Sequence, residues 1–272
     1  MDAGWCWTIP TRTDDHVGYV HSSQFLTEDE AIDELSRMYP EAHSFRTVRF
    51  RSGRHEKAWN GNVMAIGNSY AFVEPLESSG LMMITRGIMS LVSSLPASWG
   101  YPCPRAAVNS ALAKEWDAIR WFLSLHYRFN TRKDTAFWND ARKTTDVSGL
   151  EPLLEVYRSG APLCFRDSVV REFLESTAPT FYGLEGVDCL LLGQEVPAKL
   201  VSSGEPSSVW EARKAVADLL VSQACPTAEA LEAFDEFPHL NATVLTERGS
   251  WAGPRGTHRL IPSQTPAHGS AE

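Results

Sequence analysis

The stretch Gly61–Leu81, GNVMAIGNSYAFVEPLESSGL, determines how the rest of the chain is interpreted. Its apolar run Val63–Ile66 has the length and character of a buried strand. Gly67-Asn68 then permits a tight turn, and Glu74-Pro75 suits the start of a helix, where proline lacks only an N–H that would be unpaired. The small residues Ser78-Ser79-Gly80 leave the neighbouring amides open to a ligand. A turn, a carboxylate and small residues near a helix start predict a site for an anion or a cofactor.

A helix is expected after this turn, because apolar residues recur there at spacings of three and four. They are Leu81, Ile84, Ile88, Leu91 and Leu95. A purely structural interpretation is also open at this point. Glycine and asparagine often follow a strand, and a glutamate in a first helical turn, here Glu77, often only complements the helix dipole.

Composition excludes several classes of protein. The chain has 272 residues, is 43% hydrophobic and carries a net charge of −9. Such a chain can bury a substantial core, and its acidity argues against general nucleic-acid binding. It contains no apolar run long enough for a membrane span and no signal peptide at Met1–Trp5, so we expect a cytoplasmic protein without a membrane partner. Its five cysteines include no C-x-x-C pair, which predicts free thiols and no metal site.

Upstream of the central stretch, two β-prone runs predict a hairpin. They are Trp5–Pro10 and Val17–His21. Thr27 and Glu30 have the spacing of a capping box, so a helix is expected to follow them. Phe45–Arg51 alternates apolar and basic residues and predicts a half-buried strand; its arginines could attract a phosphate or simply face solvent.

Downstream, the pattern is mainly helical. One face of a long helix is marked by Val108, Leu112, Trp116, Ile119 and Leu123. Further helices are expected at 134–138 and beyond, 150–157, 209–225 and 227–237. A serine-, glycine- and proline-rich linker is predicted at 202–208, and a disordered tail at 248–272.

Three motifs resemble the flavin-dependent halogenases, the tryptophan halogenase family. They are W-x-W-x-I-P at Trp5–Pro10, G-N-x-x-A-I-G-x-x-x-x-F-x-E-P-L-E-S from Gly61, and H-Y-R-x-x-x-R-x-D-T-x-F-W from His126. The resemblance implies an α+β chain with part of the hydroxylase-like flavoprotein (flavin-monooxygenase) fold. It implies these divisions: 1–100 for part of the flavin and substrate domain, 101–200 for a helical substrate-covering region, 201–247 for peripheral helices and 248–272 for the tail.

The chemistry that the resemblance implies is halogenation of an electron-rich aromatic. A separate flavin reductase supplies reduced FAD, which reacts with O2 to give a hydroperoxide. Chloride or bromide then yields hypohalous acid, which travels through a tunnel to the substrate. Glu77 would be the catalytic carboxylate, and the amides of Ser79 and Gly80 would hold the halide. The flavin would be contacted by Gly67, Asn68 and Leu81.

The same resemblance assigns the remaining site residues. Trp5, Trp7, Ile9 and Pro10 would form the tunnel wall. Phe181 and Tyr182 would line the substrate pocket. The Tyr-Tyr pair with which family members grip free tryptophan has no counterpart here, so an indolic, pyrrolic or phenolic substrate other than free tryptophan is expected. His126, a lone histidine at a helix end, is assigned no catalytic role.

No G-x-G-x-x-G motif occurs anywhere in the sequence. That motif holds the dinucleotide pyrophosphate, and in this family it precedes W-x-W-x-I-P. The chain is therefore expected to be the C-terminal portion of a complete enzyme. Two alternatives to a halogenase remain: a related flavin-dependent monooxygenase that hydroxylates, and a non-catalytic remnant of a halogenase.

Overall fold

The computed structural model describes residues 1–95, 104–164, 167–176, 182–199 and 206–237. The chain separates into two compact units, Met1–Val201 and Ser202–Glu272. The first unit holds every predicted site residue.

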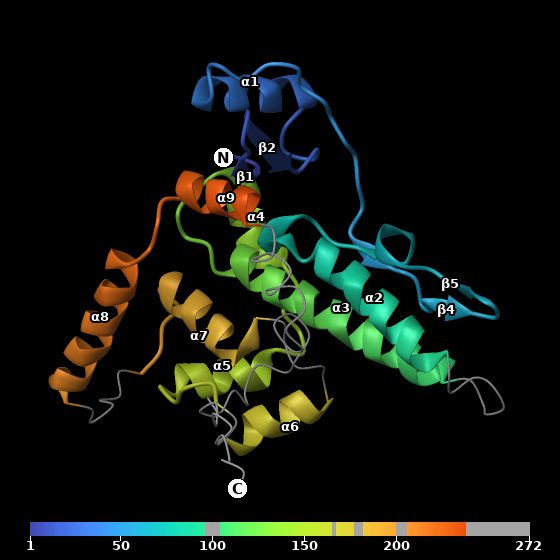
Figure 1. Ribbon diagram of the computed structural model, residues 1–272. Coiled ribbons are helices and arrows are strands. Elements are labelled where there is room, and N and C mark those ends of the chain that lie inside the picture. Colours follow the sequence, from blue (N-terminus) through green and yellow to red (C-terminus); the bar gives the residue numbers. More distant parts are fainter. Residues whose placement is uncertain (96–103, 165–166, 177–181, 200–205, 238–272) are drawn as a thin grey trace, which may run out of the picture. The chain divides into compact units, whose positions relative to one another are not determined.

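The predicted N-terminal hairpin is confirmed. Strands β1 (Gly4–Pro10) and β2 (Asp15–His21) pair antiparallel, with Trp5 opposite Val20 and Trp7 opposite Gly18. Helix α1 (Glu28–Met38) follows and lies beside this hairpin (Figure 1). Its start is the predicted capping box, in which Thr27 accepts from the Glu30 amide while Glu30 accepts from the Thr27 amide.

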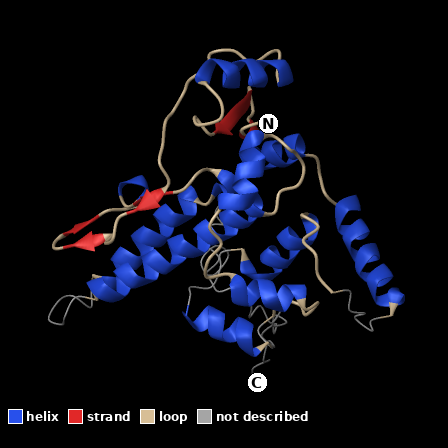
Figure 2. Cartoon of the chain, turned by 180° about the vertical axis from the view of Figure 1, so that it is seen from behind, coloured by secondary structure: helices blue, strands red, loops and turns tan. Residues whose placement is uncertain are grey.

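Short strands connect this hairpin to the helical part of the unit (Figure 2). They are β3 (Gly53–Arg54), β4 (Trp59–Asn60), β5 (Val63–Met64) and β6 (Ala71–Phe72). They form two separate two-stranded ladders, β3 with β6 and β4 with β5. Between β5 and β6 lies the short 3-10 turn η1 (Gly67–Ser69), in which the Ser69 hydroxyl bonds to the backbone of Ile66.

Two strand predictions are wrong. The run Val63–Ile66 is not a buried strand, because only its first two residues pair and the Val63 side chain is 65% exposed. Phe45–Arg51 forms no strand, and its residues are exposed. A strand needs a partner for its backbone groups, and among the described residues no neighbouring strand supplies one.

Helices α2 (Gly80–Ser94) and α3 (Arg105–Arg128) pack against each other and form the frame of the first unit (Figure 1). The predicted apolar face of α3 is confirmed, since its residues at 108, 112, 116, 119 and 123 are all buried. An Arg86–Glu115 ion pair links the two helices, and Asn109 holds β4 through both backbone groups of Trp59. These contacts position the turn between β6 and α2.

The largest core lies where α3 meets the following helices. These are α5 (Glu151–Arg158), α6 (Ser168–Ser176) and α7 (Gly183–Gly193), whereas α4 (Ala136–Thr144) contributes no residue to this core. Leu125, Leu153, Val170 and Leu191 are almost fully buried in this core. The helix predicted at 150–157 is confirmed, and Ser159 and Gly160 end it.

The second unit contains α8 (Ser207–Ser222) and α9 (Thr227–Glu236), which confirms the two helices predicted there. The predicted tail at 248–272 lies outside the described residues. With two separate antiparallel ladders, a hairpin and many helices, the chain is α+β. No helix in the described part of the chain has the length and apolar content to span a bilayer.

Candidate functional site: a carboxylate turn at the start of α2

The central feature of the site is the 3-10 turn η2 (Leu76–Ser78), which joins β6 to α2. Glu77 and Ser78 both have left-handed backbones, with φ of 65° and 52°. Residues with a Cβ avoid this region at a cost of roughly 1–2 kcal/mol each. The helix therefore begins at Gly80, later than the start predicted at Glu74-Pro75. Ser79 and Gly80, the small residues, then lie at the helix start.

Glu77 meets His126, near the end of α3. Oε1 of Glu77 lies 3.0 Å from Nε2 of His126, and the two side chains are 36% and 20% exposed. The other ring nitrogen, Nδ1, lies 3.0 Å from the carbonyl oxygen of Phe122, one helical turn earlier. The Glu77 carboxylate is thus neither buried in hydrocarbon nor fully exposed, and among the described residues His126 is its one side-chain partner, on one oxygen.

The amides that follow this turn are available to a ligand. The Ser79 carbonyl already accepts from the Met83 amide as the helix begins. Among the described residues, no turn, cap or loop hydrogen bond uses the Ser79 or Gly80 amide as donor. Ser79 is 2% exposed, and a Cβ added at Gly80 would have nothing within 4 Å. The start of α2 therefore leaves two N–H groups without a backbone acceptor, with open space at Gly80 and Ser79 buried beside it; unpaired N–H groups at a helix start favour an anion.

A second carboxylate of the turn, Glu74, is held by the residue next to His126. The Tyr127 hydroxyl lies 2.6 and 2.7 Å from the two Glu74 oxygens, and the Trp5 indole N–H donates to Tyr127 Oη at 3.0 Å. Burial raises the pKa of the Glu74 carboxyl, opposed by the bonds from Tyr127 and Trp5. Burial, together with the Glu74 charge, also raises the pKa of Tyr127. Trp5 therefore ties the N-terminal hairpin to the turn.

Tyr182, at the start of α7, lies over the same turn. Its ring stacks on Phe122 with centroids 4.1 Å apart and planes 17° from parallel, and its hydroxyl is 3.4 Å from the Glu77 carbonyl oxygen. Burial, followed by the Glu77 charge, raises the pKa of Tyr182 to about 12. Its phenol is therefore a neutral donor at physiological pH. The predicted pocket residue Phe181 lies outside the described residues.

The predicted flavin-contacting residues lie at both ends of this segment. Asn68 is exposed in η1, and Leu81 is 79% exposed in the first turn of α2. Gly67 has φ of 63°, and a Cβ there would come within 2.8 Å of the Ile84 side chain. Its glycine is thus explained by local packing and backbone geometry.

The remaining wall residues have different surroundings. The Trp7 ring covers Gly18 so closely that a Cβ there would lie 2.2 Å from ring atoms. Ile9 is 53% exposed and Pro10 is also exposed, both at the end of β1. The tunnel-wall role of these residues stays a prediction.

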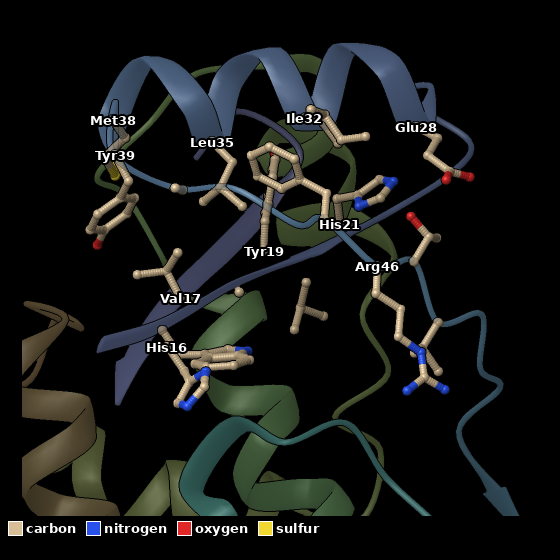
Figure 3. A pocket seen from close by; sticks show the side chains of 18 of the residues that line it. His16, Val17, Tyr19, His21, Glu28, Ile32, Leu35, Met38, Tyr39 and Arg46 are labelled. Atoms are coloured by element: carbon tan, nitrogen blue, oxygen red, sulfur yellow. The ribbon is translucent and has the colours of Figure 1, made fainter. Parts of the chain in front are cut away.

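An open groove of about 1850 Å³ lies beside the hairpin, between β2, α1 and the segment 40–50. Figure 3 shows Val17 and Tyr19 of the hairpin on the side toward Leu35 of α1, whereas His16 points to the opposite side of β2. Trp7 and Pro75 also line this groove, whereas Glu77 does not. The groove therefore reaches the carboxylate turn at Pro75, but the Glu77 carboxylate does not line it.

Comparison with known proteins identifies the family. The family model described as tryptophan halogenase matches residues 1–204. This chain belongs to the tryptophan halogenase family. The match covers the whole carboxylate turn, the hairpin with W-x-W-x-I-P and the end of α3.

Individual members of the family resemble the chain along most of its length. A crystal structure titled MibH, "a lathipeptide tryptophan 5-halogenase", is 58% identical with a TM-score of 0.83, over 94% of this chain and 49% of that one. BrvH, a flavin-dependent halogenase from Brevundimonas, is 29% identical with a TM-score of 0.71, over 86% and 47%. Tryptophan 7-halogenase RebH of Lentzea aerocolonigenes is 37% identical over 163 residues, 59% of this chain and 31% of that protein. The chain thus spans half or less of the length of these relatives.

Sequence reasoning missed three residues that form the carboxylate turn and its contacts in this member of the tryptophan halogenase family. His126, Tyr127 and Glu74 were not predicted as site residues, although the motifs that contain them were noticed. Each had a structural interpretation by itself, because a histidine or tyrosine near a helix end commonly packs. Both motifs, E-x-x-E and H-Y, are visible in the sequence. Their contact with each other is not, because only the fold brings them together.

Proposed function

We propose that this chain carries the substrate-side machinery of a flavin-dependent halogenase. The proposed reaction replaces a ring hydrogen of a tryptophan residue within a peptide by chlorine or bromine. The observation that carries the proposal is the turn itself, where the Glu77 carboxylate, fixed by His126, is followed by the free amides of Ser79 and Gly80. The amides would serve the halide, and the carboxylate beside them would serve the aromatic ring.

The peptide substrate is suggested by likeness to MibH, which is titled a lathipeptide tryptophan halogenase. It agrees with the absence of the Tyr-Tyr pair that grips free tryptophan in other members of the family. An indole within a peptide has no free amino acid backbone to grip, so that pair would have no use.

The residues at this corner fit a flavin. FAD would lie against Gly67, Asn68 and Leu81, where Leu81 offers an exposed apolar side chain and Gly80 leaves open space. When bound and reduced by a separate flavin reductase, FAD would use O2 to convert the halide into an electrophilic halogen. Part of a hydroxylase-like flavoprotein fold is proposed on the same grounds.

The chain's own groups have separate tasks in this proposal. The Ser79 and Gly80 amides would bind chloride or bromide through their N–H dipoles and the positive end of the α2 dipole. Glu77 would stabilise the positive charge that develops on the ring and then accept the ring proton. Tyr182, stacked on Phe122, would form one wall for the aromatic guest.

The test is halide-dependent product mass. The chain, with an N-terminal half that carries the G-x-G-x-x-G motif restored to it, would be incubated with a flavin reductase, FAD, NADH, O2 and a tryptophan-containing peptide, with sodium chloride or sodium bromide as halide. We expect a product in which one hydrogen is replaced by the supplied halogen, with its isotope pattern, and no such product from Glu77→Gln. A product with one added oxygen, whatever the halide, would identify a monooxygenase. No change in the peptide, together with no flavin binding, would identify a non-catalytic remnant.

A further inference from the structure

Three side chains join the N-terminal hairpin to the carboxylate turn, and each hydrogen bond in the series has a fixed direction. The Trp5 indole N–H can only donate, and it donates to Tyr127 Oη at 3.0 Å. The Tyr127 hydroxyl therefore directs its own hydrogen at Glu74, whose two oxygens lie 2.6 and 2.7 Å away. Burial and the Glu74 charge raise the pKa of Tyr127, so the phenol keeps this hydrogen. Trp5 thus orients the hydroxyl that holds Glu74.

Glu74 depends on these donors. It is partly buried, and no ion pair among the described residues includes its carboxylate. A partly buried carboxylate without a cation is stabilised by its hydrogen bonds. The Tyr127 ring is packed by α4, stacked on Trp138 with centroids 5.7 Å apart and edge-on to Phe137. The ring is thus held by packing, and the Trp5 N–H fixes the direction of its hydroxyl.

The Glu74 anchor lies just before the strained part of the turn. Glu77 and Ser78, three and four residues later, have φ of 65° and 52°. Such conformations persist only where the surroundings hold the backbone in place. The backbone of these two residues sets the direction of the N–H groups that follow, those of Ser79 and Gly80. Glu74 therefore helps to aim the two groups to which the proposed function assigns the halide.

We propose that Trp5 is a positioning residue for the halide: its N–H, acting through Tyr127 and Glu74, holds the turn in the geometry that presents the two amides at the start of α2 to chloride or bromide. This inference rests on the proposed function. The hairpin and the halide site are then coupled, so that loss of the Trp5 N–H weakens halide binding, and halide binding in turn changes the surroundings of that N–H. The role uses the polar edge of the indole and is separate from the tunnel-wall role predicted for its ring.

The direct test is a titration of the full chain with sodium chloride, followed by proton–nitrogen NMR of the backbone amides and the tryptophan indoles. The Trp5 indole signal is assigned through its connection to the Trp5 backbone. We expect chloride to move this signal with the same dissociation constant as the Gly80 amide signal. Trp210, which is 62% exposed in the second unit, is the reference for general salt effects. A Gly80 signal that moves while the Trp5 indole behaves like Trp210 would overturn the proposal.

Variants separate positioning from a general loss of packing. We expect Trp5→Phe and Tyr127→Phe each to raise the chloride dissociation constant by about 5- to 10-fold. The double variant should raise it no further, because the two groups act in series. Trp121→Phe is the matched control, since it makes the same change at an indole whose N–H has no hydrogen-bond partner among the described residues, and it should leave the constant unchanged. Additive losses, or wild-type chloride affinity in Trp5→Phe, would contradict the positioning role.

A failure of the proposed function gives a different result. If chloride moves neither the Gly80 amide nor the Trp5 indole of the wild-type chain, the turn holds no halide, and the coupling fails together with the proposed function. If chloride moves the Gly80 amide alone, the halide site stands and only the role of Trp5 is lost. The wild-type titration needs no variant, so it decides between these results even if Trp5→Phe does not fold.

Discussion

Tyr127 and Glu74 form a close contact, with the phenol oxygen 2.6 and 2.7 Å from the two carboxylate oxygens. The next residue toward the N-terminus, His126, holds the second carboxylate of the same turn, that of Glu77. Two adjacent residues of α3 thus fix both acids of the E-P-L-E segment. This arrangement explains how a turn with two left-handed residues is maintained, because strained backbone persists only where its surroundings determine it.

The first prediction concerns Trp5, whose indole N–H donates to Tyr127. Trp5→Phe keeps an aromatic ring but removes the donor, so we expect a loss of about 1 kcal/mol in the free energy of unfolding. Trp7→Phe is the control, since the described contacts of Trp7 are packing against Gly18. Urea denaturation measures both. An equal loss in the two variants would show that the hydrogen bond contributes nothing beyond packing.

Glu74 gives a prediction about pH. Burial raises the pKa of its carboxyl in the folded chain, so the folded state binds the proton more tightly than the unfolded state does. Its contribution to stability is therefore complete below the unfolded pKa and declines as pH rises through the folded pKa. We expect the difference in unfolding free energy between wild type and Glu74→Gln to fall steadily from about pH 4 upward.

Glu30→Gln provides a control of opposite sign for that measurement. The Thr27 cap lowers the pKa of the Glu30 carboxyl, so its contribution is present above the unfolded pKa and is lost on acidification. Urea denaturation across a pH series should give slopes of opposite sign for the two variants. A flat difference for Glu74→Gln would contradict the raised pKa.

The features that could be predicted from the sequence are those determined by residues close together along the chain. The hairpin, the Thr27 capping box and the apolar face of α3 were predicted correctly because a few neighbouring residues determine them. Phe45–Arg51 was predicted wrongly because alternation indicates a strand only when another strand is there to pair with it. Glu77 was selected through its motif, but its left-handed backbone was not foreseen, since nothing local favours φ of 65° in a glutamate.

The contacts of the site could not be predicted for a similar reason. Glu77 and His126 are separated by 49 residues in sequence, and Trp5 and Tyr127 by 122. Only the packing of α3 against the turn and the hairpin brings these pairs together. The roles of the Ser79 and Gly80 amides remain predictions, although their position at the start of α2 is compatible with halide binding.

The strain in the turn can be measured at Ser78. Its φ of 52° is costly for serine and costs glycine little, so we expect Ser78→Gly to stabilise the fold by up to about 1 kcal/mol. Ser79→Gly is the matched control, because φ there is −72°, so glycine relieves no strain, adds entropy to the unfolded chain and removes a buried side chain. Thermal denaturation should therefore shift in opposite directions. A destabilised Ser78→Gly would show that the serine side chain contributes more than the strain costs.

The ionisation of Tyr182 reports on the charge of Glu77. Burial and that charge together raise the pKa of the phenol to about 12, and the neutral amide in Glu77→Gln removes the second cause. We therefore expect the Tyr182 phenol to ionise at lower pH in Glu77→Gln than in wild type. Carbon NMR of labelled tyrosine follows the titration, with Tyr182→Phe to assign the signal. Glu74→Gln should leave the titration unchanged, and an equal shift in both variants would contradict the assignment.

The final prediction concerns the amide of Gly80. Proline is tolerated in the first helical position, so Gly80→Pro removes this N–H, at a cost to the αR backbone of Ser79 before it, whereas Gly80→Ala keeps the N–H and adds a methyl group to open space. If this amide binds the halide, the NMR line of the chloride ion should broaden in the presence of wild type and Gly80→Ala. It should broaden much less in the presence of Gly80→Pro. Helical circular dichroism of both variants verifies that α2 is retained. Equal chloride broadening in the two folded variants would show that the halide is held elsewhere, and the anion-binding role of this turn would have to be abandoned.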